Sequence, residues 1–376
     1  MVMRPKLAIL VSFSGQGGVE RMIANLSQSL AMAPIDLDIL LIKAKGPHVA
    51  ALPDNANVIH LRARHTATSI FEVARYLRRE KPDALLAVKH RGIIAALQAR
   101  TLARTSTPIS GRLGTTVSAA LASKSPRRRA RWFSTMRRYY PKLHQLIAVS
   151  QGVADDVITI TGMSDTQVTV VRNPTVTPAM LSNATLPVEH PWFAENAPPV
   201  LLGVGRLTEQ KDFPTLLRAF SEVVKRRDAR LIILGEGQLR ETLLEQAQQL
   251  GIADKMALPG FAENPWAWMH RAAVFVLSSR WEGSPNTLTE ALALGTPVVS
   301  TDCPSGPREL LSGGDIAPLV PMGDVAALSE AILSTLSNPP EAATLIHAVK
   351  DYHQDISAER YLDALGLAID WPHRGQ

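Results

Sequence analysis

Two glutamates, Glu282 and Glu290, frame the stretch of the sequence that is richest in groups for ligand chemistry. A carboxylate carries two acceptor oxygens and can bind both hydroxyls of a ribose, which is the role expected for Glu290 on the second turn of a predicted helix. Glu282 precedes that helix and would meet the sugar end of the same ligand. The same pattern also fits two solvated glutamates beside an ordinary helix start.

The residues between the glutamates predict a helix that begins beside a bound anion. A strand candidate ends near Ser278, Ser284 suits the N-cap, and Pro285 suits the first helical position. The free amides of the first turn would then favour a phosphate. The residues expected to contact the ligand here are Gly283, Ser284, Pro285, Asn286, Thr287 and Leu288.

Two cations follow another predicted strand, in Gly205-Arg206-Leu-Thr-Glu-Gln-Lys211. Arg206 closes the strand and Lys211 precedes the next helix. Fixed cations at such positions would neutralise a diphosphate leaving group as its charge develops. An Arg and a Lys in a loop also fit plain surface charges.

Glycines mark further strand exits. The first exit, Gly15-Gln-Gly17-Gly18-Val-Glu20, lacks the dinucleotide-binding spacing Gly-x-Gly-x-x-Gly, but it lets backbone approach a ligand closely. Gly235 predicts a similar close approach, and the backbone near Phe261 is expected to contact a base. A simple tight turn remains an alternative for the first of these exits.

The elements that position these turns alternate between short apolar runs and helical patterns. The runs at 6–13, 37–43, 84–89, 108–112, 145–150 and 168–172 precede a loose stretch, and the pattern restarts at 199–206. Continuous apolar strands between helices predict buried parallel sheets, so the fold class is α/β with two doubly wound, Rossmann-like domains. We expect an N-terminal domain over 1–185, a second domain over 186–355, and a last helix over 356–376 that packs back on the first domain.

Composition bounds the function. The chain has 376 residues, 46% of them hydrophobic, and one cysteine, Cys303, which excludes an internal disulfide framework and fits the cytoplasm. No apolar run is long enough to span a membrane, and the apolar N-terminus is interpreted as a first strand, not a signal peptide. Residues 1–188 hold 25 Lys/Arg and 10 Asp/Glu, whereas residues 189–376 hold 15 and 24, so the first half is expected to face an anionic partner.

A basic segment over 124–142 carries eight Lys/Arg and no acid, with aromatic residues at near-helical spacing. Such a helix can lie on an anionic membrane, and the alternative is a solvated helix whose aromatic residues pack into its own domain. No nucleic-acid-binding signature accompanies the charge. The candidate membrane-surface residues are Arg127, Arg128, Arg129, Arg131, Trp132, Arg137 and Arg138.

Together these pieces resemble glycosyltransferase family 4, the retaining enzymes of GT-B fold, whose two domains face each other across a cleft. The glutamate pair matches that family's glutamate–seven residues–glutamate motif. The match extends over 205–212, 234–237, 259–261 and 301–309, and it includes Asn173-Pro174 before the linker. The resemblance is dense over 200–310 and sparse but in order over 1–180.

The resemblance implies a role for each candidate. Glu290 would bind the ribose, Arg206 and Lys211 the diphosphate, and Glu282 with the backbone of 283–287 the donor sugar, while Gly17 and Gly18 would close over the phosphates. The family requires no metal and no carboxylate nucleophile.

This chain departs from the family where many relatives have a histidine, because it has Ser110-Gly111-Arg112-Leu113 there. Arg112 is therefore a candidate active-site cation, or else a structural residue, and His90 is a second candidate.

The expected function is retaining transfer of a hexosyl group from a nucleotide-sugar, UDP-sugar before GDP-sugar, to a sugar-bearing and lipid-linked acceptor in bacterial glycan or polysaccharide synthesis. The enzyme would work in the cytoplasm at the inner face of the membrane, without metal or nucleic acid. The alternatives are a GT-B sugar-nucleotide epimerase or hydrolase, and a non-catalytic nucleotide-sugar-binding protein at the membrane.

Overall fold

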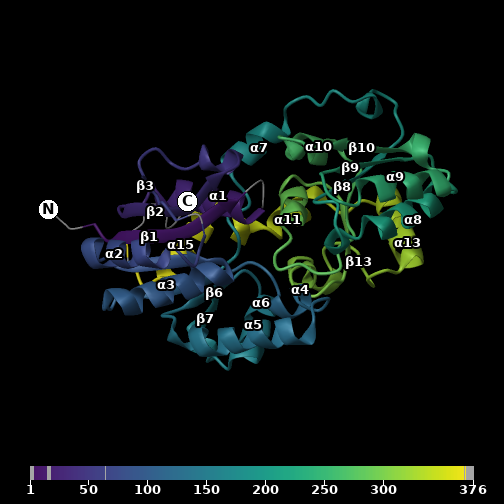
Figure 1. The fold of residues 1–376 in the computed structure, drawn as a ribbon. Coiled ribbons are helices and arrows are strands. Elements are labelled where there is room, and N and C mark those ends of the chain that lie inside the picture. The colour runs from purple at the N-terminus through teal and green to yellow at the C-terminus, as the bar shows by residue number, and fades with distance from the viewer. Residues whose placement is uncertain (1–3, 15–17, 64, 368, 370–376) are drawn as a thin grey trace. The chain divides into compact units, whose positions relative to one another are not determined.

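The computed structural model describes residues 4–14, 18–63, 65–367 and 369, and the chain divides into two compact units. Unit 1 comprises Met1–Thr175 and Tyr352–Gln376, and unit 2 comprises Val176–Asp351. Each unit holds one parallel sheet with helices on its faces (Figure 1). The prediction of two doubly wound α/β domains is confirmed.

Unit 1 contains a seven-stranded sheet in the order β3-β2-β1-β4-β5-β6-β7. The first strand shows why the sheet is buried on both faces, since Leu7, Ile9, Val11 and Phe13 join one apolar cluster while Ala8 and Leu10 join the other. The strands are β1 (Lys6–Ser14), β2 (Asp36–Lys45), β3 (Asn57–His60), β4 (Ala84–Val88), β5 (Ile109–Leu113), β6 (Leu146–Ala148) and β7 (Val168–Val170).

Helices cover both faces of this sheet. One face carries α2, α3, α5 and α6, and the other carries α1 and the C-terminal helix α15, which is drawn in yellow among the purple elements of Figure 1. The helices of unit 1 are α1 (Gly18–Leu30), α2 (Ile70–Glu80), α3 (Lys89–Ala103), α4 (Val117–Ala120), α5 (Pro126–Tyr139), α6 (Gln151–Thr161) and α15 (Gln354–Ala364). The buried side chains of α15 include Ala358, Tyr361 and Leu362.

Unit 2 contains a six-stranded sheet in the order β10-β9-β8-β11-β12-β13. Its strands are β8 (Val200–Val204), β9 (Arg230–Leu234), β10 (Met256–Gly260), β11 (Val274–Leu277), β12 (Val298–Thr301) and β13 (Leu319–Val320). Its helices are α7 (Pro178–Ala184), α8 (Phe213–Val224), α9 (Arg240–Gln249), α10 (Pro265–Arg271), α11 (Asn286–Ala293), α12 (Pro307–Leu310), α13 (Val325–Ser337) and α14 (Ala342–His347).

The division between the units differs from the predicted boundary at residue 185, because unit 2 already begins at Val176. The reason is α7, which packs on α10 of unit 2. Asn264 Nδ2, at the start of α10, donates to the Asn183 carbonyl of α7 at 2.7 Å. The proline-rich stretch that suggested the boundary therefore lies within unit 2, after the point where the chain leaves unit 1.

Candidate active site

The candidate active site of unit 2 lies where the strand order reverses, between β8 and β11. In doubly wound sheets, ligands bind outside the carboxyl ends of the strands at such a reversal. The segments that leave these two strands are joined by hydrogen bonds, since Arg280 N donates to the Gln210 carbonyl at 2.8 Å and Gln210 Nε2 donates to the Trp281 carbonyl at 2.9 Å. The tertiary fold thus brings the predicted Arg206–Lys211 turn to the predicted Glu282 turn.

The central interaction of this site is an ion pair between Lys211 and Glu282. Lys211 Nζ lies 2.6 Å from Glu282 Oε1, and the two side chains are 16% and 9% exposed. Ser279 Oγ donates to the same carboxylate oxygen at 2.7 Å, and Ser278 Oγ donates to the Lys211 carbonyl at 2.7 Å. A largely buried charge pair with this support is fixed in position and ready to meet developing charge.

Arg206 stands apart from this pair. Its side chain is exposed, and within the part of the chain that the structure describes it has no ion-pair partner. By contrast, Arg280 pairs with Asp212 at 3.1 Å and Glu209 at 3.4 Å. Arg206 is therefore the cation at this edge whose charge is available to a ligand anion.

Helix α11 begins one turn after Glu282, as expected, but its cap differs from the prediction. Pro285 occupies the N-cap position, no side chain caps the helix, and Ser284 lies before it. Ser284 Oγ and Thr287 Oγ1 are buried, with no hydrogen-bond partner among the described residues. The loop after β12 packs closely here, because a Cβ at Gly306 would stand 2.6 Å from Pro285 Cδ and 3.1 Å from the Gly283 carbonyl oxygen.

Glu290 lies on the second turn of α11 and is 1% exposed, so it is not a solvated surface glutamate. Gly283 and Leu288 are buried as well, while Asn286 is half-buried. Burial of a carboxylate is costly unless it is paired or hydrogen-bonded. Its burial therefore excludes the alternative of a solvated glutamate at this position.

The glycines of unit 2 bring its strand exits into contact. A Cβ at Gly235 would lie 1.9 Å from the Gly205 carbonyl oxygen, and Gly235 has φ +140°. The Gly235 amide donates to the Gly260 carbonyl at 2.8 Å. The carboxyl ends of β8, β9 and β10 are therefore locked together through backbone alone.

A cavity of about 260 Å³ lies beside these glycines. Phe261, which is 50% exposed, lines it together with Trp268 and the residues 259–264 that leave β10. The cavity joins apolar walls to backbone groups at a strand exit, which suits a small planar ring.

Cys303 follows β12 next to the ion pair, and sequence inspection had given it no role. Burial, reinforced by the charge of Glu282, raises the pKa of the Cys303 thiol to about 12. The thiol is therefore protonated at neutral pH and unsuited to act as a nucleophile.

The role of Ser279 at this site was not predicted, although a serine at the end of a buried strand could have indicated it. Across the described residues, no group of three or more His, Cys, Asp or Glu is placed to hold a metal ion.

In unit 1, the predicted glycine turn is partly visible. Gly17 lies outside the described residues, and Gly18 is the first residue of α1. Two residues later, Glu20 is 5% exposed at its side chain and accepts from Lys89 Nζ at 2.8 Å. This ion pair joins the starts of α1 and α3, at the carboxyl ends of β1 and β4.

The contacts of Arg112 favour the structural alternative over an active-site cation. It is 2% exposed at the end of β5, where its Nε donates to the Tyr361 hydroxyl at 2.8 Å and its Nη2 donates to Asn173 Oδ1 at 2.5 Å. Both partners are neutral, and one belongs to α15. Arg112 therefore joins the C-terminal helix α15 and the segment around Asn173, near the end of the first part of unit 1, to the sheet of that unit.

His90 is also drawn into the core of unit 1. Its ring stacks on Trp132 with centroids 4.4 Å apart, and its Nδ1 lies 3.0 Å from the Tyr140 hydroxyl. Burial, followed by the charge of Arg91, lowers the pKa of His90 to about 4. A neutral, packed imidazole holds α5 against α3, and nothing in its contacts assigns it to the reacting centre.

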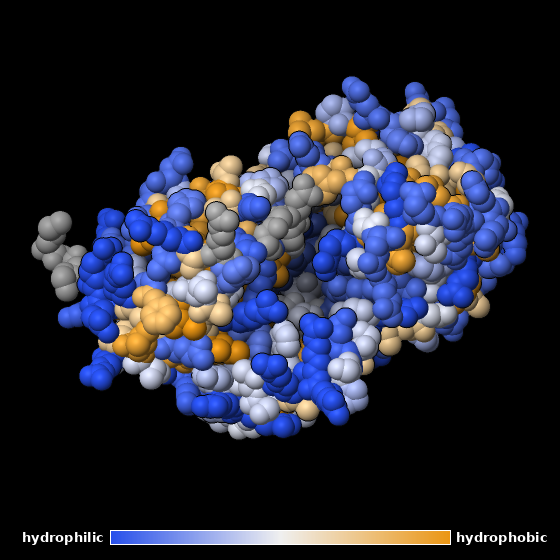
Figure 2. All heavy atoms as spheres, viewed as in Figure 1, coloured by the Kyte–Doolittle hydropathy of each residue, from blue (hydrophilic) through white to orange (hydrophobic). Residues whose placement is uncertain are grey.

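The basic helix α5 uses its aromatic face within its own domain. Trp132, Phe133 and Tyr139 pack against the apolar cluster under α2, α3 and α6, as in the alternative of a helix whose aromatic residues pack into its own domain. Arg137 Nε donates to the Ile160 carbonyl at 2.9 Å, and Arg129 is half-buried. The exposed cations of α5 are Arg127, Arg128, Arg131, Arg137 and Arg138, although Arg137 is engaged by its hydrogen bond. Figure 2 shows hydrophilic surface at the lower edge of the view, where Figure 1 places α5.

Over the described residues, no helix is both long and apolar enough to cross a membrane.

Comparison with known proteins matches each half of the chain to a family model. Residues 16–177 match Glycosyltransferase Family 4, and residues 190–352 match Glycosyl transferases group 1. The resemblance inferred from the motifs is confirmed by these matches.

Three curated relatives show how far the similarity extends. An uncharacterized glycosyltransferase of Methanocaldococcus jannaschii is 46% identical over 30% of this chain, and an N-acetylgalactosamine-N,N'-diacetylbacillosaminyl-diphospho-undecaprenol 4-alpha-N-acetylgalactosaminyltransferase of Campylobacter jejuni is 35% identical over 37%. These matches span only 28% and 37% of the length of the two relatives. The lipopolysaccharide core biosynthesis glycosyltransferase LpsE of Rhizobium meliloti is 26% identical over 85% of this chain and 86% of its own length.

The fold has close solved counterparts. The Anabaena protein HepE, solved in complex with UDP and glucose, superposes with a TM-score of 0.78 at 17% identity, covering 97% of this chain and 100% of that chain. The chain therefore belongs to the glycosyltransferases of GT-B fold, with a family 4 domain followed by a group 1 domain.

Proposed function

We propose that this protein transfers a hexosyl group with retention from a UDP-sugar to a sugar-bearing acceptor, in bacterial lipopolysaccharide or polysaccharide synthesis. The observation that carries the proposal is the Lys211–Glu282 ion pair at the strand-order reversal, with the exposed Arg206 beside it. The names of the Campylobacter and Rhizobium relatives support the acceptor class, and the UDP complex of the Anabaena protein supports the donor.

Each residue of the site has a role in this reaction. Arg206 and Lys211 stabilise the diphosphate as it leaves, since Lys211 is already held at the strand exit and the exposed Arg206 adds a second charge beside it. Glu282 holds the donor sugar, Glu290 binds the ribose, and the start of α11 carries the amides that meet phosphate oxygens. The cavity beside Phe261 receives the base. The leaving diphosphate takes the acceptor proton on the same face of the ring, so the step needs neither a carboxylate nucleophile nor a metal ion.

Replacing Glu290 by alanine should weaken UDP binding by roughly 10- to 150-fold, because a hydrogen bond to a charged group is worth about 1.5–3 kcal/mol. Calorimetric titration with UDP measures this directly. Glu245→Ala, which removes an exposed carboxylate from α9 of the same unit, is the matched control. Equal UDP affinity in Glu290→Ala and Glu245→Ala would refute the ribose assignment.

The reaction class is tested by incubating the enzyme with UDP-sugar alone. A transferase leaves the donor largely intact until an acceptor is added, whereas an epimerase or hydrolase consumes or converts it. A non-catalytic binding protein leaves the donor unchanged in both conditions. Product stereochemistry, read by NMR of the anomeric proton, decides whether the donor configuration is retained.

We further propose that the enzyme works on lipid-linked acceptors at the inner face of the cytoplasmic membrane, to which α5 brings its exposed cations. Arg127→Glu/Arg128→Glu/Arg131→Glu should lower affinity for phosphatidylglycerol vesicles at least about 100-fold, since each near-surface cation contributes about 1 kcal/mol. Cosedimentation at low salt measures this, with turnover of a soluble acceptor expected to stay unchanged. The control reverses Arg75, Arg78 and Arg79, which are exposed on α2. A wild-type protein that stays in the supernatant defeats the proposal.

A further inference from the structure

The edge of the unit 1 sheet where its strands end carries a group of cations that the proposed function does not use. Parallel pairing places the ends of β1, β2, β3 and β4 along one edge, with Ser14 opposite Lys45 and Leu41 opposite His60. We name the cations that stand there the basic edge. It consists of Lys43, Lys45, Arg62, Lys89 and Arg91.

These side chains are accessible. Lys43, Lys45, Arg62 and Arg91 are exposed, and Lys89 is 42% exposed at its side chain even though it pairs with Glu20. Positions at the last residues of β2 and at the start of α3 are set by buried strands and a long helix, so these cations are held on rigid elements. Exposed cations gathered at one edge raise the local concentration of anions.

Neighbouring acids offset only part of the positive charge at this edge, since two glutamates stand beside five cations. In the described segments that leave β1, β3 and β4, the acids are Glu20 and Glu72. Glu20 pairs with Lys89, and Glu72 accepts from the backbone amides of Arg62 and Ala63 at 2.9 and 2.8 Å. The segment after β2 has Asp54, whose neighbour in the chain, Asn55, lines the cavity at the opposite edge of the sheet.

One more cation, Arg21, lies near the basic edge and acts on His48 beside it. Burial, and next the charge of Arg21, lowers the pKa of His48, while Glu20 raises it. Arg21 and His48 thus lie near Glu20, where α1 begins after β1. Because its pKa is lowered, His48 adds no positive charge at neutral pH, and Arg21 is the one of the two that does.

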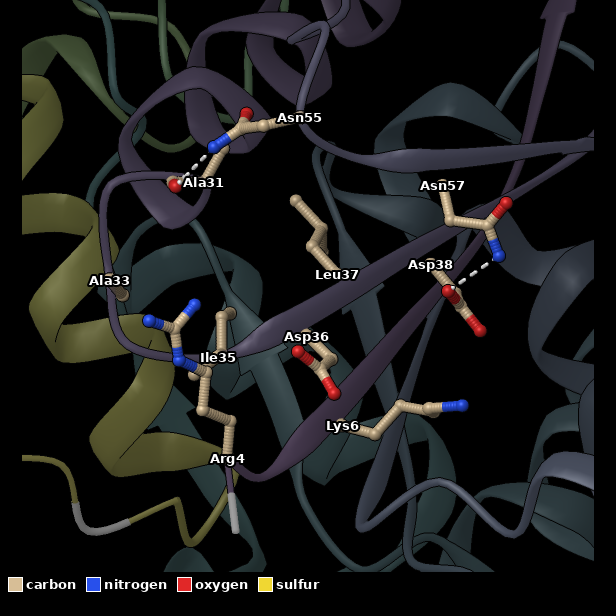
Figure 3. A pocket seen from close by; sticks show the side chains of 10 residues that line it. All are labelled: Arg4, Lys6, Ala31, Ala33, Ile35, Asp36, Leu37, Asp38, Asn55 and Asn57. Atoms are coloured by element: carbon tan, nitrogen blue, oxygen red, sulfur yellow. Dashed lines mark hydrogen bonds between the residues drawn. The ribbon is translucent and has the colours of Figure 1, made fainter. Parts of the chain in front are cut away.

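The opposite edge of the same sheet differs in its charges, although the domain as a whole is basic. There, Arg4 and Lys6 alternate with Asp36 and Asp38 around a cavity of about 340 Å³ (Figure 3). Lys6 pairs with Glu80 at 2.8 Å. The Asp38 carboxylate accepts from Asn57 at 2.9 Å and from the Tyr76 hydroxyl at 2.6 Å. Charges at that edge are mixed and internally paired.

We propose that the basic edge binds a phosphate or diphosphate carried by the acceptor, so that the acceptor is a phosphorylated sugar or a diphosphate-linked lipid sugar. This inference rests on the proposed function, because it assigns the acceptor of the same reaction. Lysine and arginine recognise phosphate through charge-assisted hydrogen bonds. The donor diphosphate is assigned to its own cations in unit 2, Arg206 and Lys211, which leaves the basic edge for a second anion.

The test titrates inorganic pyrophosphate into protein saturated with UDP, so that the donor site is already filled. The variant Lys43→Gln/Lys45→Gln/Arg91→Gln should bind pyrophosphate at least about tenfold more weakly than wild type, as expected for three charges removed from one anion site. The control Arg75→Gln/Arg79→Gln removes exposed charge from α2 and should match wild type. No pyrophosphate binding in the presence of UDP, or an equal loss in the control, overturns the proposal.

Two further arms separate the sources of the phosphate. Glucose 1-phosphate and farnesyl diphosphate are titrated in the same way; tighter binding of the farnesyl compound assigns a lipid-linked acceptor, and tighter binding of the sugar phosphate assigns a soluble one. If UDP itself fails to bind while pyrophosphate still depends on the basic edge, the donor assignment fails and the basic edge stands. If UDP binds and pyrophosphate does not, the donor assignment stands and the basic edge is rejected as a phosphate site.

Discussion

Replacing Lys211 by methionine should lower kcat by about 10²–10³-fold, with a much smaller change in the KM for donor. The ammonium group is held at a strand exit by Glu282 at 2.6 Å, and a preorganised charge contributes most where charge develops in the transition state. Steady-state kinetics with UDP-sugar and a fixed acceptor measures the effect. A kcat within about threefold of wild type would exclude Lys211 from stabilising the leaving group.

The same substitution should destabilise unit 2, and this effect must be separated from catalysis. With Lys211 gone, the 9%-exposed Glu282 carboxylate loses its cation, and leaving a buried charge unpaired costs about 3–5 kcal/mol. Lys211→Met/Glu282→Gln should recover most of that stability in thermal unfolding without recovering kcat. The control pair, Lys225 and Glu222, is 65% and 47% exposed, so the corresponding double variant should change neither quantity.

Replacing Gly235 by alanine should lower the unfolding free energy by about 3 kcal/mol or more, through strain at a positive φ and forced backbone movement. The new Cβ would stand 1.9 Å from the Gly205 carbonyl oxygen, which backbone shifts alone can relieve. For a domain of this size the melting temperature should fall by roughly 6–12 °C. UDP should lose its stabilising effect, because the exits of β8 and β9 carry the donor site.

The control for this prediction is Gly313→Ala. Gly313 also has a positive φ, +73°, but a Cβ there meets nothing within 4 Å. Its cost is therefore confined to the backbone conformation, about 1 kcal/mol. Equal losses in the two variants would show that close packing at Gly235 contributes nothing.

Much of the fold was predictable because buried parallel strands have a strong sequence signature. Runs such as Leu7–Val11 and Leu231–Leu234 are apolar at every position, and both faces of each run enter a core. Two strands escaped prediction. β3 is only partly buried, with an exposed residue at each end, and β13 has two residues. Edge strands of this kind lack a continuous apolar run, so their existence follows from pairing with a neighbour.

The candidate site was predicted in part for a related reason. The sequence indicates which residue types end each strand, because helix starts, glycines and cations are local features. It does not indicate which strand exits are neighbours. The reversal between β8 and β11 brings Lys211 to Glu282 across 71 positions of chain, and helix α11 begins after Pro285, so Ser284 is not its cap.

Arg112 and α5 show where local reasoning fails. The sequence left open whether the cation after a strand faces a ligand or is structural, and whether the basic helix faces a membrane or packs its aromatic residues into its own domain. Arg112 instead meets Tyr361, 249 positions away, and the aromatic side of α5 packs into its own domain. Burial depends on which distant elements arrive at a surface, which residue type and spacing do not encode.

By itself, the sequence determined the two α/β domains, the family and the set of strand-exit residues, since period, glycine placement and motif spacing are local. Only the tertiary structure decided that Glu282 is paired with Lys211, that Glu290 is buried, and that Arg112 belongs to the core. The physical reason is that a charge acquires its role from its partners and its exposure, and both are set by contacts between elements far apart in the chain.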